Sequence, residues 1–203
     1  SSNMIQIVEI GAFSDLLLLS DLNLSNNQIV ILNPQSMINM PGLNRIDLSC
    51  NKIKTLQRKS FDNLRADFAF INLQNNLISY VHPQVFEDML SEQVSIYLDH
   101  NLIENVDNIF DNHSFLEIWL NNNPIKHFSD VCKQECNTWS IILTCTKLNE
   151  TETESAVKWA FRKNLTLFVD DCEPNSDTCN RAYSKEGSSF SVLIAALVLI
   201  NVV

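Results

Sequence analysis

The sequence has few glycines and few basic residues, and it lacks the short motifs that identify many enzymes. Only 3 of its 203 residues are glycine, and none of them forms a glycine-rich phosphate loop. No H-E-x-x-H metal motif and no G-x-S-x-G nucleophile turn occurs. The 4 histidines are scattered without the spacing of metal ligands. We therefore expect no enzymatic activity, no metal site and no cofactor.

Acidic residues outnumber basic residues. The chain has 14 lysines and arginines against 24 aspartates and glutamates, which gives a formal net charge of −10 at pH 7. Nucleic acids and anionic membrane surfaces attract clusters of basic side chains, so the sequence disfavours both as partners. The carboxylates crowd between residues 150 and 177, where a solvated acidic face is the simplest interpretation.

One arrangement of apolar residues around an asparagine recurs along most of the chain. The copy that begins at Leu43 places Ile46, Leu48 and Ile53 around Asn51. Its asparagine belongs to a series with intervals of 24, 25, 25 and 22 residues, which comprises Asn27, Asn51, Asn76, Asn101 and Asn123. Apolar and polar residues alternate before each asparagine, which predicts a short strand with one buried face. We expect each asparagine amide to satisfy backbone groups at the turn that follows.

This pattern resembles the leucine-rich-repeat family, whose repeats follow L-x-x-L-x-L-x-x-N with a period of roughly 20 to 29 residues. The resemblance implies an α/β fold: a right-handed solenoid over residues 1–128 with a parallel sheet on its concave side. Asn3 fits the asparagine position of a further repeat whose strand is absent. We therefore expect the chain to be a fragment that begins in mid-repeat, without upstream repeats, N-terminal cap and signal peptide.

Strand residues that point away from the predicted core form the candidate binding surface. Three aromatic residues fall on it in successive repeats, where they have no core to fill and resemble the anchors of protein interfaces. The alternative is that the aromatic residues only shield the sheet from water. Two acidic residues flank them, which suggests a partner with apolar and basic features. The candidate partner-binding residues are Phe70, Asn72, Tyr97, Asp99, Glu117, Trp119 and Asn121.

Residues 129–180 follow the last repeat and contain five of the 6 cysteines: Cys132, Cys136, Cys145, Cys172 and Cys179. A cysteine-rich segment in this place resembles the C-terminal cap of extracellular leucine-rich-repeat proteins, and the resemblance implies disulfides. The pairing stays open, because Cys132-Lys-Gln-Glu-Cys136 replaces the usual Cys-x-Cys opening. Zinc is disfavoured, since only Cys132 and Cys136 form a close pair. Cys50 is expected to be a free thiol or the partner of a residue upstream.

Within this cap, residues 151–164 predict an amphipathic helix that covers the last coil. Its inward residues are expected to be Ala156, Val157, Ala160 and Phe161.

Four N-x-[ST] sequons predict glycosylation at Asn23, Asn112, Asn149 and Asn164. A glycan on Asn23 would occupy the concave face at its first strand, which would favour binding at the aromatic end.

The chain ends in an apolar stretch, residues 190–203. As a helix it would reach about 21 Å, short of the roughly 30 Å hydrocarbon core of a bilayer. With the polar spacer before it, the stretch is typical of a glycosylphosphatidylinositol (GPI) signal. Asn180 is the favoured attachment residue, with Ser184 and Gly187 as alternatives, and everything beyond the attachment residue, residues 181–203 in the favoured case, would be removed. The alternatives are a weak tail anchor and a buried C-terminal strand.

These observations predict a non-enzymatic, GPI-anchored module of the cell surface that binds a protein ligand on its concave face, for adhesion or recognition. The alternative is a secreted innate-immune recognition or inhibitor protein that uses the same surface. A third possibility is an intracellular repeat scaffold, which would keep its cysteines reduced.

Overall fold

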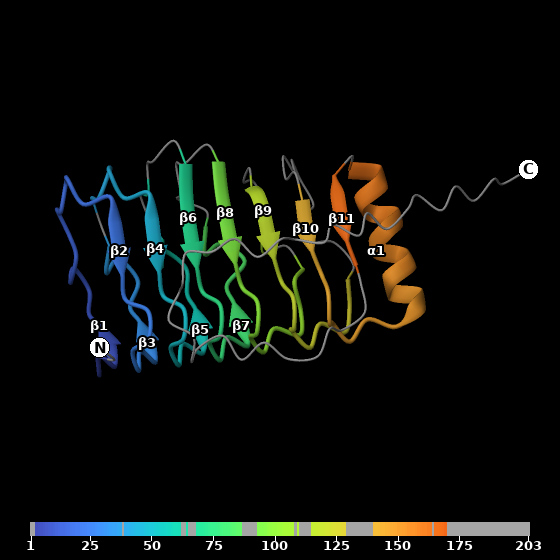
Figure 1. Cartoon of the computed structure of the whole chain (residues 1–203), viewed down its shortest axis with the longest axis horizontal. Helices are drawn as coiled ribbons and strands as arrows, with labels where there is room; N and C mark the ends of the chain where they lie inside the picture. The colour runs from blue at the N-terminus through green and yellow to red at the C-terminus, as the bar shows by residue number, and fades with distance from the viewer. Residues whose placement is uncertain are drawn as a thin grey trace, which may run out of the picture.

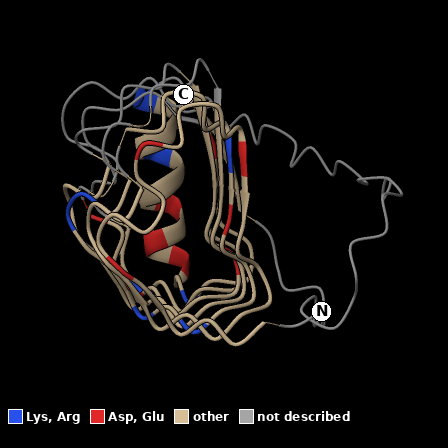
Figure 2. Cartoon of the chain, turned by 90° about the vertical axis from the view of Figure 1, so that its left-hand side faces the viewer, with Lys and Arg blue, Asp and Glu red and all other residues tan. Residues whose placement is uncertain are grey.

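The chain folds as a stack of similar coils, each laid against the one before it (Figure 1). The computed structural model describes residues 3–37, 39–61, 64, 68–86, 93–107, 109, 115–128, 140–163 and 165–169. Viewed along the stack, the described segments of successive coils superimpose on one another (Figure 2). This is the parallel solenoid that the recurring leucines and asparagines predict.

One wall of the solenoid is a seven-stranded parallel sheet, in which the strands follow one another in chain order. Its strands are β2 (Asp21–Asn23), β4 (Arg45–Asp47), β6 (Phe68–Asn72), β8 (Gln93–Tyr97), β9 (Phe115–Trp119), β10 (Ser140–Ile142) and β11 (Thr166–Phe168). Shorter strands form two separate parallel pairs along the lower edge of Figure 1. They are β1 (Ile7–Val8) with β3 (Ile31–Leu32), and β5 (Thr55–Leu56) with β7 (Tyr80–Val81).

The core runs along the axis of the solenoid as rows of equivalent residues. One row consists of the leucines that follow the strands, and it is buried throughout: Leu24, Leu48, Leu73, Leu98, Leu120 and Leu143. Each leucine N–H donates to a carbonyl of the next coil, as Leu48 does to Asn72 at 2.8 Å. The alignment of these leucines in one interior row confirms the predicted repeat register.

The repeat asparagines form a ladder of side-chain hydrogen bonds inside the turns. Asn76 shows the pattern: its Oδ1 accepts from the Ile53 N–H at 3.0 Å, and its Nδ2 donates to the carbonyls of Leu48 and Leu73, both at 3.0 Å. Asn51, Asn101 and Asn123 make the same three bonds in their own coils. The prediction that these asparagines are framework is confirmed.

A residue with left-handed backbone geometry stands directly before each asparagine of the ladder. These residues are Asn26, Cys50, Asn75, His100 and Asn122, with φ between 54° and 55°. Asparagine and histidine enter this region more readily than most residues with a Cβ, so the turns form without glycine. A sixth turn of the same kind has Cys145 at φ 54°. Thr146 follows it, where the earlier coils have asparagine.

The helix α1 (Glu150–Lys163) lies across the C-terminal end of the stack (Figures 1 and 2). Its bounds agree within one residue with the predicted helix. Its buried side chains are Ala156, Trp159 and Ala160, and the Trp159 ring meets Phe128 edge-on with centroids 5.2 Å apart. The predicted inward face was therefore partly wrong, since Val157 and Phe161 are 52% and 83% exposed. In the described part of the chain, no helix is long and apolar enough to cross a bilayer.

Candidate binding surface

The outer face of the seven-stranded sheet presents rows of side chains that the strand register fixes. We call "outer face" the side of this sheet that points away from the solenoid core. The first row contains Asp21, Arg45, Phe70, Ser95, Glu117, Ser140 and Thr166. The second row contains Asn23, Asp47, Asn72, Tyr97, Trp119, Ile142 and Phe168. Residues in one row sit on adjacent strands, which lie about 4.8 Å apart.

Three aromatic rings form a continuous stack on this face, which we call the aromatic stack: Phe70, Tyr97 and Trp119. The centroids of Phe70 and Tyr97 are 4.8 Å apart, and those of Tyr97 and Trp119 are 5.5 Å apart with an interplanar angle of 21°. These separations are close to the strand spacing, so each ring stands on its own strand and packs on its neighbour. All three side chains are half-buried. The structure thus brings together the three aromatic residues that the sequence placed on one surface.

A charged side chain lies at each end of the aromatic stack. The guanidinium carbon of Arg45 lies 4.6 Å from the centroid of the Phe70 ring, within the range of a cation–π contact. At the other end, Oε2 of Glu117 accepts hydrogen bonds from Trp119 Nε1 at 3.0 Å and from the Tyr97 hydroxyl at 3.4 Å. Arg45 is exposed, whereas Glu117 is half-buried. Glu117 is among the contact residues predicted from the sequence, whereas Arg45 is not.

Two of the predicted contact residues, Asn72 and Asp99, are buried rather than available to a partner. Their relative exposures are 2% and 4%. Asn72 is opposite Tyr97 in the strand register, and its Oδ1 accepts from the Gln74 N–H at 3.1 Å. The expectation that these two residues offer exposed contacts was wrong, because an outward direction does not prevent neighbours from covering a short side chain.

Asp99 and Asn121 tie neighbouring coils together. Asp99 Oδ1 accepts from the Asn121 N–H at 2.9 Å, and its Oδ2 accepts from Gln74 Nε2 at 2.6 Å. Asn121 repeats this one coil later, since its Oδ1 accepts from the N–H and hydroxyl of Thr144 at 2.9 Å and 2.8 Å. Desolvation by burial raises the pKa of Asp99, against the opposing effect of these hydrogen bonds. Both residues therefore connect the turns that follow neighbouring strands, next to the binding surface.

The two N-terminal strands carry short polar side chains that bond to their own turns. Asn23 Oδ1 accepts from the N–H and hydroxyl of Ser25 at 3.0 Å and 2.7 Å. Asp47 makes the equivalent bonds to Ser49 at 3.0 Å and 2.6 Å. This half of the outer face is therefore polar, whereas the other half is aromatic.

The outer face continues beyond residue 128. Strands β10 and β11 add Ile142 and Phe168 to the second row, and both side chains are half-buried. Neither position is among the contact residues predicted from the sequence. The signal that could have found them is the alternation of buried residues in the Ile141-Ile142-Leu143 run, which the absence of a following asparagine obscured.

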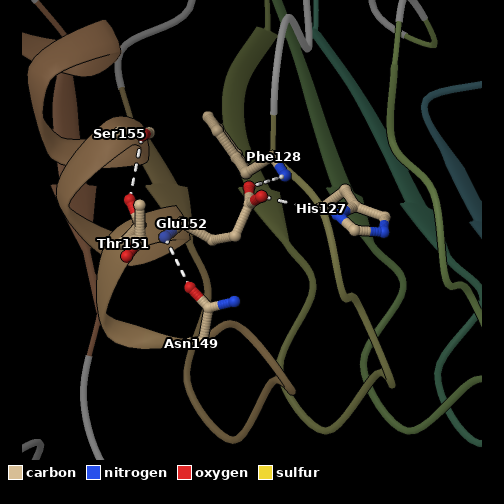
Figure 3. A network of polar contacts seen from close by, with 6 residues as sticks. All are labelled: His127, Phe128, Asn149, Thr151, Glu152 and Ser155. Atoms are coloured by element: carbon tan, nitrogen blue, oxygen red, sulfur yellow. Dashed lines mark hydrogen bonds and ion pairs between the residues drawn. The ribbon is translucent and has the colours of Figure 1, made fainter.

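Among the predicted glycosylation sites, Asn149 is exposed and directly precedes α1. Its Oδ1 accepts from the Glu152 N–H at 2.9 Å, which is the contact of an N-cap (Figure 3). Asn23 is exposed on β2. Asn112, Asn164 and the proposed attachment residue Asn180 lie outside the described residues, as does the apolar stretch 190–203.

Of the cysteines predicted to form disulfides, only Cys145 lies within the described residues. Cys145 is half-buried at the sixth turn, and Cys132, Cys136, Cys172 and Cys179 lie outside the described residues. Cys50 is disulfide-bonded, so the free-thiol alternative for this residue is wrong. Within the described ranges, no cluster of histidine, cysteine and carboxylate side chains could hold a metal ion.

Comparison with known families agrees with the geometry. The family model described as leucine rich repeat matches residues 1–49 and 41–103, which together span just over half of the chain. No curated protein sequence matches the chain.

Proposed function

Because this chain belongs to the leucine-rich-repeat family, whose repeats commonly mediate protein binding, we propose that it is a non-enzymatic module that binds a partner protein through the outer face of its sheet. A solenoid of stacked coils presents such a face on a rigid frame, so little conformational entropy is lost when a partner docks. The outer face corresponds to the concave side of the predicted solenoid.

The aromatic stack carries this proposal. Large aromatic rings that stand half-buried on a sheet offer rigid apolar area, and aromatic residues dominate the affinity of many protein interfaces. Here three such rings are held in place by each other and by the hydrogen bonds from Tyr97 and Trp119 to Glu117. Ile142 and Phe168 extend the apolar area across two further strands. The polar half of the face, around Asn23 and Asp47, would contribute less.

The cellular setting proposed for this module is the cell surface, with a GPI anchor at Asn180 and a role in adhesion or recognition. Support comes from the apolar stretch 190–203 and from the sequons. Asn149 is compatible with a glycan, because it caps α1 through Oδ1 and a glycan would be attached at Nδ2. Secretion with a role in innate-immune recognition is the alternative.

The binding proposal is tested with the full chain against an array of purified cell-surface ectodomains. A partner found in this way should bind the Tyr97→Ala and Trp119→Ala variants about thirtyfold more weakly, since truncation of an interface anchor costs about 2 kcal/mol or more. Tyr80→Ala is the matched control, because Tyr80 is 52% exposed on the separate strand β7. Unchanged affinity in both stack variants, with normal folding, would rule out this face as the binding surface.

The anchor is tested separately on cells that express the complete transcript. A phosphatidylinositol-specific phospholipase should release the protein from the surface. Recovery from the medium without the enzyme would favour the secreted alternative instead. Free thiols at the cysteines from Cys132 to Cys179 in non-reducing mass mapping would argue for an intracellular scaffold.

A further inference from the structure

Arg45 presents a positive charge on the outer face, and no described carboxylate neutralises it. Its guanidinium packs on Phe70, and within the described residues no carboxylate lies within ion-pair distance of it. Two acidic residues are its neighbours in the strand register, and each accepts from a serine hydroxyl: Asp21 from Ser20 at 2.6 Å, and Asp47 from Ser49 at 2.6 Å. The five N–H donors of the guanidinium are therefore available to an acidic group of a partner.

Glu117 presents the opposite charge at the other end of the aromatic stack. Its Oε2 is fixed by Trp119 and Tyr97, while Oε1 accepts no hydrogen bond from any residue that the structure describes. A carboxylate that is half-buried among aromatic rings has lost part of its hydration. A basic group from a partner would restore the lost interactions at Oε1, and an Arg or Lys side chain is suited to this.

The distance between these two charges follows from the register. Arg45, Phe70, Ser95 and Glu117 occupy the same row on four adjacent strands, so Arg45 and Glu117 are separated by three strand spacings, or about 14 Å. An extended peptide advances about 3.3 Å per residue, and four residues therefore span about 13 Å. Side chains at positions i, i+2 and i+4 of such a peptide also point to the same side.

We propose that the outer face recognises an extended segment of a partner protein that crosses the strands and carries an acidic and a basic residue four positions apart, with an apolar residue midway. The acidic residue pairs with Arg45, the basic residue pairs with Glu117, and the apolar residue lies on the aromatic stack. This inference rests on the proposed function and names the partner's chemistry. Either chain direction satisfies it, because reversing the segment keeps the charge spacing.

The spacing is tested with two peptides of identical composition, titrated into the full chain in mild detergent and followed by the NMR signal of the Trp119 indole N–H. The first is acetyl-Gly-Glu-Ser-Leu-Thr-Arg-Gly-amide, in which the charges are four positions apart. The second is acetyl-Gly-Ser-Glu-Leu-Arg-Thr-Gly-amide, in which they are two apart. The first peptide should bind about tenfold more tightly. Equal affinities would overturn the inference.

The two contacts are tested by charge exchange. Arg45→Gln and Glu117→Gln should each weaken the first peptide about threefold to fivefold, as expected for pairs near the surface. The Glu117→Arg variant should lose the first peptide and gain a peptide with Glu at both charged positions. That rescue excludes misfolding as the cause. Lys126→Gln is the control. Lys126 lies outside the strands of this sheet, and its Nζ forms an ion pair with Glu104 Oε2 at 2.9 Å.

The outcomes separate this inference from the proposed function. If the identified partner loses affinity on Tyr97→Ala but keeps it on Arg45→Gln and Glu117→Gln, the charge spacing is wrong while protein binding by the aromatic stack stands. If none of these substitutions changes the affinity, both proposals fail.

Discussion

The carboxylate of Glu152, in the first turn of α1, accepts a hydrogen bond from the backbone N–H of Phe128 at 3.1 Å (Figure 3). Its second oxygen lies 3.4 Å from His127 Nδ1. Glutamate at this position of a helix commonly turns back to the N-cap residue, here Asn149. In this protein it reaches across to the preceding coil instead, so one side chain joins the closing helix to the solenoid.

This contact predicts a pH-dependent contribution to stability. The Phe128 N–H and then His127 lower the pKa of Glu152 below its ordinary value of 4.5. A carboxylate with a lowered pKa stabilises the fold above its unfolded-state pKa and loses that effect as the pH falls through the folded-state value. Glu152→Gln should therefore lower the Tm near pH 7, and the difference from the parent chain should shrink below about pH 4. Glu150→Gln, in the same turn, is the control; an equal loss of Tm in both variants would contradict the assignment.

The buried carboxylate of Asp99 predicts the opposite dependence. Burial raises its pKa above the ordinary value of 3.8, so the folded state binds the proton more tightly than the unfolded state. The contribution of this residue to stability should thus increase as the pH falls through the window between those two pKa values. A carboxyl carbon NMR titration measures the shift directly. Asp99→Asn should remove this part of the pH dependence of the Tm, whereas the exposed control Asp21→Asn should leave that dependence unchanged. A titration below 3.8 would exclude desolvation as the dominant effect.

Each asparagine of the ladder should be indispensable to its coil. Asn76→Ala removes the partner of the Ile53 N–H and of two carbonyls in the buried turn. Unsatisfied buried backbone groups cost about 1–3 kcal/mol each, so we expect a loss of about 3 kcal/mol or more in the free energy of unfolding. Urea denaturation measures it. Asn44→Ala, at an exposed position, should change this free energy by less than about 0.5 kcal/mol. Similar losses in both variants would argue against the ladder.

The orientation of α1 can be tested with two aromatic residues that lie two positions apart. Trp159 is 4% exposed and packs on Phe128, whereas Phe161 is 83% exposed. Trp159→Ala should cost about 3–5 kcal/mol of unfolding free energy. Phe161→Ala should cost less than about 0.5 kcal/mol. The reverse order in urea midpoints would show that the helix packs through its other face.

The sequence predicts the solenoid well because its signal is repeated. Leu48 and Asn51 have counterparts at the same offsets in neighbouring coils, and stacking turns each recurrence into an aligned row. The same recurrence predicts that the aromatic stack lies on one face. It could not show that Asn72 lies below the surface, because strand alternation gives the direction of a side chain and says nothing of how its neighbours cover it.

The C-terminal part was harder to predict, because its residues occur once. A helix pattern that includes Ala156 and Ala160 is compatible with either Val157 or Trp159 on the inward side, since these positions flank the same stripe. Packing against Phe128 selects Trp159, and this contact depends on a coil far from the helix in sequence. The sixth coil escaped detection for a similar reason, as Thr146 replaces the asparagine that identifies the other turns.

The end-on position of α1 has a mechanical consequence. In the described part of the chain, the strands of the sheet follow chain order and each pairs only with its direct neighbours in the stack. A pulling force applied to the chain after β11 would therefore act on the coils one at a time. The helix and the last strand would unfold first, and the contact between Glu152 and Phe128 would break before the inner coils open. The strands that carry Arg45 and Glu117 lie farther from this end of the stack. The spacing of these two residues would therefore be preserved after the C-terminal coil had unfolded.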